Sequence, residues 1–194
     1  MITVVDYGAG NLRSVVNVLD TIGAAHCVIT EGAALRDATK VLLPGVGHFG
    51  QLARALDDRG LRGPLLTAVA TGVPLLGICL GMQILFESSD EATGAHGLGV
   101  LTGHVSRIEG ADRLPHMGWN TVTPQPGSTL VPTEQRFYFA NSYCCPVTGA
   151  TAATTAYGET FATVVQAGPV SGVQFHPEKS GRVGVDVVRR WAVA

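Results

Sequence analysis

The sequence predicts a three-layer α/β fold over residues 1–194, a single domain with a mostly parallel central sheet, flanking helices and a β-rich insertion. Short apolar runs alternate with helical periodicity in the first half of the chain, which is the order typical of βα units. These runs are apolar throughout rather than at every second residue, which indicates parallel strands buried on both faces. From about Gly97, short β-like runs lie between Gly, Pro and Thr residues, which indicates the insertion.

Each element of the first half has a local signal. Apolar residues recur at helical spacing from Leu12 to Ile22, and Gly23 is placed to end that helix. Phe49 to Ala70 is expected to be a helix interrupted near the string RGLRGP, and the string CLGMQILFE is expected to begin another helix. The expected strands are Ile2–Asp6, His26–Thr30, Lys40–Gly45 and Val73–Ile78.

The second half is expected to be mostly β-structure, followed by one last helix. Short strands are expected in the strings GLGVLTGHVSRIE, QRFYFANSYCC, ATTAYG, FATVVQ and SGVQFHP. Helical spacing resumes through Val183, Val187, Val188 and Trp191, and Ser180 is the expected N-cap of this helix.

Composition and charge favour a compact protein that binds neither nucleic acid nor a membrane. The chain is 46% hydrophobic and 14% charged, with a net charge of −2 and only 13 Lys and Arg, so no broad basic face is available. No apolar stretch reaches the ~18–20 residues that a membrane helix needs, and the start MITVVDYGAG lacks a signal-peptide pattern. The cysteines form no C-x-x-C pair, which favours a reducing, cytoplasmic setting, and Cys27, Cys144 and Cys145 are expected to be packing residues.

Cys79 lies between Gly77 and Gly81, where a strand is expected to turn into a helix. A G-x-nucleophile-x-G turn of this kind is a nucleophile elbow, in which glycines let the strand and the helix pack closely around a strained residue. The helix N-terminus would favour both a thiolate and a developing oxyanion. The alternative, which this motif alone does not exclude, is a small buried cysteine at a tight corner.

The string GVQFHPEKS offers the base and the orienting group that a thiol nucleophile needs. His176 follows an apolar run, at a strand end where parallel α/β sheets commonly carry their chemistry. Pro177 disfavours a helical His176, and in an extended segment Glu178 would face the same side as the imidazole. The carboxylate would then fix the tautomer and stabilise the imidazolium. The alternative is an exposed strand end with ordinary polar residues.

A glycine-rich turn, LPGVGHFG, follows the third expected strand. Its N–H groups around Val46 and Gly47 can point at a carbonyl oxygen beside Cys79, with the Leu80 N–H as a further oxyanion donor. The alternative is a βα turn that simply needs small residues, and His48 is expected to be structural. The string YGAGN is too short for a dinucleotide fingerprint and is expected to form a turn or part of an interface, so no cofactor is expected. No metal site is expected either.

The strings PGVG, GICLGMQ and FHPE, in this order, resemble those of the class I (triad) glutamine amidotransferases, and the resemblance runs from about Val4 to the last helix. The longer strings DYGAGNLRSV, PHMGWN and GVQFHPEKSG look like the glutaminase subunits of imidazole glycerol phosphate synthases. The resemblance implies a triad of Cys79, His176 and Glu178 and an oxyanion turn at Val46 and Gly47. It also implies that the substrate glutamine is held by Gln83, Glu91, Asn141, Ser142 and Tyr143, although many relatives have His where this chain has Asn141.

The implied reaction is hydrolysis of L-glutamine to glutamate and ammonia through a thioester on Cys79. In the family a (β/α)8-barrel cyclase subunit, the partner in a heterodimer, uses the ammonia to make imidazole glycerol phosphate and aminoimidazole carboxamide ribotide during histidine synthesis. Because idle hydrolysis would waste glutamine, the turn from Gly45 to Gly47 is expected to gain its aimed N–H only when the acceptor site fills. The resemblance places the partner interface at Asn11, Trp119, Tyr138 and Lys179, although Trp119 alone also fits a core position and Lys179 a solvated charge.

Three rival functions remain open at this point. A stand-alone cysteine hydrolase or peptidase would need an open cleft, for which no sequence feature argues. A non-catalytic binding subunit is disfavoured because Cys79, His176 and Glu178 are all present. A glutaminase subunit for another acceptor, as in pyridoxal phosphate or anthranilate synthesis, is disfavoured by PHMGWN and DYGAGNLRSV.

Overall fold

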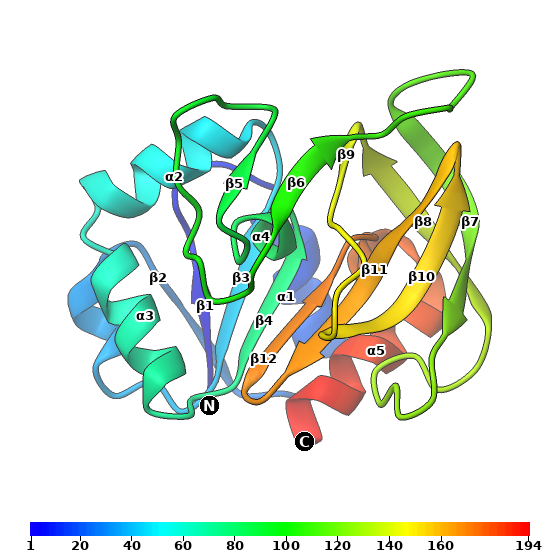
Figure 1. The fold of residues 1–194 in the computed structure, drawn as a ribbon. Helices are drawn as coiled ribbons and strands as arrows, with labels where there is room; N and C mark the ends of the chain where they lie inside the picture. Colours follow the sequence, from blue (N-terminus) through cyan, green and yellow to red (C-terminus); the bar gives the residue numbers. More distant parts are fainter.

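The structure, a computed structural model, describes residues 1–194 and contains two sheets (Figure 1). The strands are β1 (Ile2–Val5), β2 (His26–Ile29), β3 (Val41–Gly45), β4 (Leu75–Cys79), β5 (Ser88–Ser89), β6 (His104–Arg107), β7 (His116–Pro124), β8 (Gln135–Asn141), β9 (Tyr143–Cys144), β10 (Thr151–Tyr157), β11 (Glu159–Ala167) and β12 (Val170–Val173). The helices are α1 (Leu12–Thr21), α2 (Phe49–Asp58), α3 (Arg62–Ala70), α4 (Leu80–Gln83) and α5 (Gly181–Val193), with short 3-10 turns η1 (Gly32–Leu35) and η2 (Pro177–Lys179). None of the helices is both long enough and apolar enough to cross a membrane.

The large sheet has the order β2-β1-β3-β4-β12-β11-β10-β7-β8, and its first five strands run parallel. Successive residues of β1 point to opposite faces of the sheet. Val4 packs in a core cluster with residues of α1 and α5, whereas Val5 packs in a second cluster with residues of α2 and α3. Both side chains are fully buried, which is why these strands are apolar at every position. The predicted three-layer α/β fold is therefore confirmed.

The β-rich segment continues the same sheet rather than forming a separate layer (Figure 1). Strands β11, β10, β7 and β8 extend it beyond β12 as antiparallel neighbours, and only β5, β6 and β9 form the small second sheet. Strand β7 was not among the expected strands. It pairs with β8 along its length, from His116 opposite Asn141 to Val122 opposite Gln135.

The helix expected from CLGMQILFE is wrong in its extent, because α4 ends at Gln83. The following loop takes over the carbonyl groups that a longer helix would use. The Leu98 N–H donates to the Ile84 oxygen at 2.6 Å, and the Leu101 N–H donates to the Leu85 oxygen at 3.0 Å. The apolar side chains of Ile84 and Leu85 are therefore buried in turns, not on a helix.

Ser180 occupies the N-cap position of α5 but does not cap the helix with its side chain, so that expectation is wrong. Its hydroxyl instead donates to the His176 carbonyl oxygen at 2.7 Å and accepts from the Tyr138 N–H at 2.9 Å. The His176 N–H donates to the Tyr138 oxygen at 2.8 Å. Ser180 thus ties the segment after β12 to strand β8.

The carboxyl ends of four neighbouring strands meet at one edge of the sheet. Gly45 of β3 pairs with Cys79 of β4, and Ile78 of β4 pairs with Val173 of β12. Strand β1 ends beside β3, and its chain continues to Tyr7. Ligands commonly bind at this edge of parallel sheets, so the residues just past each strand are the ones to examine.

Candidate active site

Cys79 lies in a strained turn between β4 and α4. Its φ of 55° and ψ of −112° make it the one non-glycine residue with a positive φ. A Cβ atom on Gly77 would collide with the Gly81 carbonyl group, and a Cβ atom on Gly81 would collide with the carbonyl group of Leu43. Strain of this kind costs ~1–3 kcal/mol and persists only where the surroundings enforce it. The tight strand–helix turn expected from the glycines is present.

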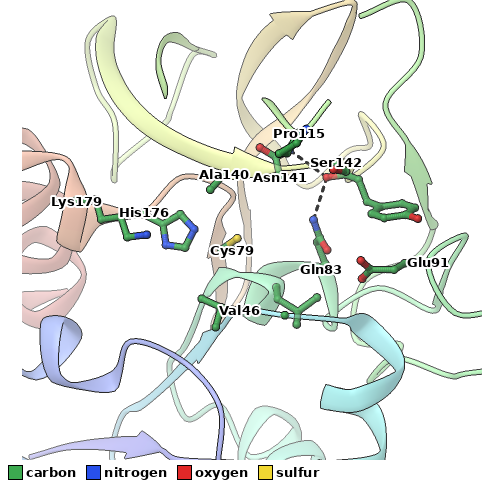
Figure 2. Close-up of a pocket in the computed structure, with 13 residues that line it drawn as sticks. Val46, Cys79, Gln83, Glu91, Pro115, Ala140, Asn141, Ser142, His176 and Lys179 are labelled. Carbon is green, nitrogen blue, oxygen red and sulfur yellow. Dashed lines mark hydrogen bonds between the residues drawn. The ribbon is translucent and has the colours of Figure 1, made fainter. Parts of the chain in front are cut away.

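Cys79 lines a pocket of about 280 Å³, into which residues from several segments point (Figure 2). The sulfur faces His176 on one side, and Gln83 and Glu91 lie on the other. The lining includes every residue for which contact with glutamine was expected, namely Gln83, Glu91, Asn141, Ser142 and Tyr143. It also includes the three residues expected to donate to the oxyanion, namely Val46, Gly47 and Leu80.

His176 and Glu178 form a buried ion pair beside the sulfur. His176 Nδ1 donates to Glu178 Oε1 at 2.8 Å, and each side chain is only 3% exposed. The expectation that an extended segment brings Glu178 to the imidazole is wrong, because Pro177–Lys179 forms the 3-10 turn η2. His176 itself is extended, with φ of −98° and ψ of 98°, and the 3-10 turn brings the carboxylate back to the ring.

The protonation of His176 is set by opposing effects. Burial lowers the pKa of the imidazole. The charge of Cys79 and the hydrogen bonds of the imidazole to Cys79 and Glu178 outweigh burial and raise the pKa to about 10. An imidazolium is therefore the stable form at neutral pH. An imidazolium next to a cysteine favours the thiolate, which is the nucleophilic form of sulfur.

Gln174 was missed by the sequence reasoning. It is fully buried, and its Nε2 donates to Cys79 Sγ at 3.6 Å while its Oε1 accepts from Gln83 Nε2 at 3.0 Å. Gln83 Nε2 also donates to the Tyr143 oxygen at 3.0 Å, so the Gln83 Oε1 atom is the one left to face a ligand. The available signal was an amide residue inside the apolar run GVQF, where an unpaired polar group would be costly.

The far end of the pocket carries oxygen acceptors. Glu91 Oε2 accepts from the Phe49 N–H at 2.7 Å at the start of α2, which leaves Oε1 without a protein partner. Asn141 Nδ2 donates to the Tyr143 oxygen at 3.0 Å, while Asn141 Oδ1 is buried without a partner. The free carboxylate oxygen of Glu91 suits a ligand with an ammonium group.

The oxyanion turn differs from the expectation in one respect. The Val46 N–H, expected to face Cys79, instead donates to the hydroxyl oxygen of Tyr7 at 2.9 Å. The Gly47 N–H has no acceptor within the protein, and Gly47 has a φ of 96°. His48 is structural, because its Nδ1 accepts from the Gly50 N–H at 3.1 Å at the start of α2.

The other cysteines lie outside the pocket. Burial is the main cause that raises the pKa of Cys144 to about 12, and burial also raises the pKa of Cys145 well above its usual value. Both therefore remain thiols. Cys27 is half-buried on β2. Cys79 is the one cysteine that combines a pocket with a histidine partner.

Of the residues expected at a partner interface, Lys179 lines the pocket, Tyr138 contacts Lys179, and Trp119 contacts Tyr138. Trp119 is 47% exposed, so it is not a core residue, and its ring meets the Tyr138 ring edge to face at 6.4 Å. Lys179 lies at the pocket rim with its Nζ 5.7 Å from the centre of the Tyr138 ring. Asn11 is exposed at the start of α1, a helix that contacts η2.

Comparisons with known proteins agree with this fold and site. The family model for class-I glutamine amidotransferases matches residues 3–192. The chain therefore belongs to the class-I glutamine amidotransferase family. Two solved structures share the fold: a glutamine amidotransferase with a TM-score of 0.79, 18% identity and 100% coverage of both chains, and PurLQS from Thermotoga maritima with a TM-score of 0.75, 19% identity and coverage of 97% and 95%.

More similar relatives carry a more specific name, the imidazole glycerol phosphate synthase subunit HisH. The protein of that name from Methanothermobacter thermautotrophicus is 41% identical, with 98% of this chain and 97% of the relative covered. The HisH of Oceanobacillus iheyensis is 39% identical, with 98% of each covered, and that of Symbiobacterium thermophilum is 43% identical, with 98% and 92% covered.

Proposed function

We propose that this chain is the glutaminase subunit of an imidazole glycerol phosphate synthase, which hydrolyses L-glutamine and supplies the ammonia to a cyclase partner in histidine biosynthesis. The observation that carries the proposal is the strained Cys79 facing a buried His176–Glu178 pair in a small pocket. The similarity to HisH proteins over 98% of this chain supports the acceptor and the pathway. A pocket of about 280 Å³ also suits one amino acid better than a polypeptide, which disfavours a peptidase.

The first half of the reaction forms a thioester. The Cys79 thiolate, which Gln174 Nε2 contacts at 3.6 Å, attacks the side-chain carbonyl carbon of glutamine. The carbonyl oxygen becomes an oxyanion, for which the Leu80 N–H at the start of α4 is the expected donor. His176 then gives its proton to the amide nitrogen, the C–N bond breaks and ammonia leaves. Glu178 stabilises the imidazolium before this step and orients the neutral ring after it.

The second half hydrolyses the thioester. Neutral His176 takes a proton from water as the oxygen of that water attacks the thioester carbon. The C–S bond breaks, glutamate is released, and the thiolate and the imidazolium are restored. At the other end of the substrate, Glu91 is proposed to hold the α-ammonium group, with Asn141, Ser142 and Tyr143 around it.

The ammonia has to reach an acceptor without passing through bulk water, where protonation would remove its nucleophilic lone pair. We assign the acceptor site to a (β/α)8-barrel cyclase that docks on the surface formed by Asn11, Trp119, Tyr138 and Lys179, next to the pocket. The products there would be imidazole glycerol phosphate and aminoimidazole carboxamide ribotide. The four free cysteines support a reducing, cytoplasmic setting for the complex.

Co-purification with the cyclase tests the proposal. The complex should form imidazole glycerol phosphate from glutamine and from ammonium salt. Cys79→Ala should abolish the glutamine-dependent rate and leave the ammonium-dependent rate unchanged. Cys27→Ala, a half-buried cysteine outside the pocket, should leave both rates unchanged. Glutamine-dependent synthesis that survives in the Cys79→Ala complex would refute the proposal.

A further inference from the structure

One side chain, Tyr7, fixes the main chain of the oxyanion turn. Its hydroxyl group donates to the Val46 carbonyl oxygen at 3.0 Å and accepts from the Val46 N–H at 2.9 Å. Tyr7 is only 5% exposed, so water does not compete for these bonds. A single hydroxyl group therefore sets the orientation of the peptide groups on both sides of Val46.

Nothing else holds this part of the turn. The main-chain groups of Val46 and Gly47 make no other hydrogen bond within the protein. Gly47 has no side chain to pack, and a Cβ atom placed on it would meet only Gln51 Oε1, at 3.8 Å. On the far side the chain is fixed again, because the Phe49 N–H donates to Glu91 Oε2. The two peptide groups next to Val46 can therefore reorient once the Tyr7 bonds break, without moving β3 or α2.

We propose that Tyr7 is a latch: its hydroxyl group withholds the Val46 N–H from the oxyanion, and this keeps glutamine hydrolysis slow until the latch opens. The inference rests on the proposed function, because it concerns the donor that the thioester-forming step needs. Tyr7 does not touch the substrate, so it is a positioning residue and acts through Val46. The expected gating of the Gly45–Gly47 turn thereby acquires a specific group that performs it.

The latch is within reach of a docking partner. Tyr7 is followed by the exposed segment Gly8–Asn11, which leads into α1. A Cβ atom placed on Gly10 of this segment would lie 3.8 Å from Val46 Cγ2, so the segment runs beside Val46. Asn11 belongs to the surface proposed for the cyclase, so a movement of the docked cyclase when its acceptor site fills can reach the segment that leads to Tyr7 and Val46. The string YGAGN, expected to form a turn or an interface segment, thus acquires a specific role.

The chemistry of Tyr7 suits a latch that stays closed at neutral pH. Burial is the main cause that raises the pKa of its phenol above 10.0, with a further contribution from the charge of Cys79. The hydroxyl group therefore keeps its proton and continues to donate to the Val46 carbonyl oxygen. Opening has to come from movement of the chain rather than from titration.

Tyr7→Phe tests the latch in the complex with the cyclase, because it removes the hydroxyl group and keeps the ring. Glutaminase turnover is measured with the acceptor site empty and with it filled. One oxyanion donor is commonly worth ~10²–10³ in rate, so we expect the empty-site kcat of Tyr7→Phe to rise at least ~10-fold. The KM for glutamine should stay within about twofold of the wild-type value. The stimulation by acceptor should fall by the same factor by which the empty-site kcat rises.

Tyr157→Phe is the matched control, since it removes a tyrosine–carbonyl hydrogen bond outside the pocket, from Tyr157 to the Arg113 oxygen. This variant should keep the wild-type stimulation. The inference is overturned if Tyr7→Phe leaves the empty-site rate and the stimulation unchanged, or if it lowers both rates together, as a purely structural role would. Failure of the proposed function gives a different result, because the wild-type complex itself would then release no ammonia from glutamine.

If Tyr7→Phe does not fold, Gly47→Ala weakens the same arrangement from the backbone side. A side chain disfavours the φ of 96° that Gly47 adopts in the latched turn, while the space around it is open. This variant should also raise the empty-site rate and reduce the stimulation. Wild-type stimulation in Gly47→Ala would contradict the latch.

Discussion

At the scale of single residues, the chemistry depends on the proton that His176 holds. With a pKa of about 10, His176 would enter the proposed reaction as an acid that can protonate the departing ammonia. Gln174 Nε2, an uncharged group, donates a hydrogen bond to the Cys79 sulfur. The charge of Cys79 and the hydrogen bond to Cys79 are the main causes that raise the pKa of His176, and Glu178 adds a hydrogen bond and a charge.

Glu178→Gln removes the charge and nearly keeps the shape. Because a negative carboxylate raises the pKa of His176, its loss should lower that pKa. Activity that needs the imidazolium disappears as pH rises through this pKa. We therefore expect an alkaline limb of kcat/KM near pH 10 in the wild type and at lower pH in Glu178→Gln, with a loss of ~10²-fold or more at neutral pH.

The pH profile of the complex checks this expectation, with Glu134→Gln as a control that neutralises an exposed carboxylate outside the pocket. That control should leave the alkaline limb in place. An unchanged limb in Glu178→Gln would mean that the carboxylate does not govern the proton on His176.

At the scale of elements, the site is assembled by strand ends and by close backbone contacts. Gly45, Gly77 and Gly81 bring β3, β4 and α4 so close that a Cβ atom on any of them would collide with neighbouring main chain. This packing fixes the Cys79 turn directly beside the oxyanion turn. The position of the nucleophile is therefore a property of the junction between two elements.

Gly81→Ala should destabilise the protein, because the new Cβ atom would collide with the Leu43 carbonyl oxygen at the end of β3. Overpacking of this kind costs ~1–3 kcal/mol. Gly63→Ala is the matched control on α3, where nothing lies within 4 Å of the new atom. It should stabilise the fold by ~0.4–1 kcal/mol. Denaturant unfolding measures the change in the free energy of unfolding for each variant, a decrease for Gly81→Ala and an increase for Gly63→Ala. Equal free energies of unfolding would contradict the packing argument.

The sequence predicted the elements with strong local signals and missed those set by tertiary contacts. Helix α1 has helical spacing and ends near Gly23, whose φ is 68°. Strand β7 contains Gly118 and Asn120 and has no local strand pattern, and its pairing with β8 decides its conformation. The early end of α4 also follows from a later loop that takes its carbonyl groups, which no local pattern encodes.

The same division applies to the site. Cys79, His176 and Glu178 belong to strings with a recognisable pattern, and the structure places them together. Gln174 and Tyr7 contact residues that are distant in the sequence, Cys79 and Val46, so spacing alone could not single them out. Ser180 was assigned a local capping role, whereas its partners lie in β8 and before η2.

At the scale of the whole molecule, the pocket lies next to an exposed aromatic surface. Met117 and Trp119 of β7 are 66% and 47% exposed, and the Tyr138 ring lies between Trp119 and Lys179. Exposed aromatic side chains beside a cation are common anchors of protein interfaces. A partner seated there would cover the side of the pocket where Lys179 lies, which places ammonia release next to the docked subunit (Figure 2).

Trp119→Ala should weaken the complex with the cyclase at least ~10-fold in Kd, since truncation of an aromatic anchor commonly costs more than about 1.4 kcal/mol. Val147→Ala removes a comparably exposed apolar side chain, 53% exposed, outside β7 and β8. That control should leave Kd unchanged. Titration calorimetry of both variants compares them, and an unaltered Kd for Trp119→Ala would move the docking surface elsewhere.

The most direct measurement is mass spectrometry of the protein after reaction with an electrophilic diazoketone analogue of glutamine. A sulfur that attacks the side-chain carbon of glutamine should carry one equivalent of the analogue on the peptide containing Cys79, with ammonia release lost in proportion. The peptides of Cys27, Cys144 and Cys145 should remain unmodified. Full glutaminase activity with an unmodified Cys79, or an adduct on another cysteine that abolishes activity, would contradict the account.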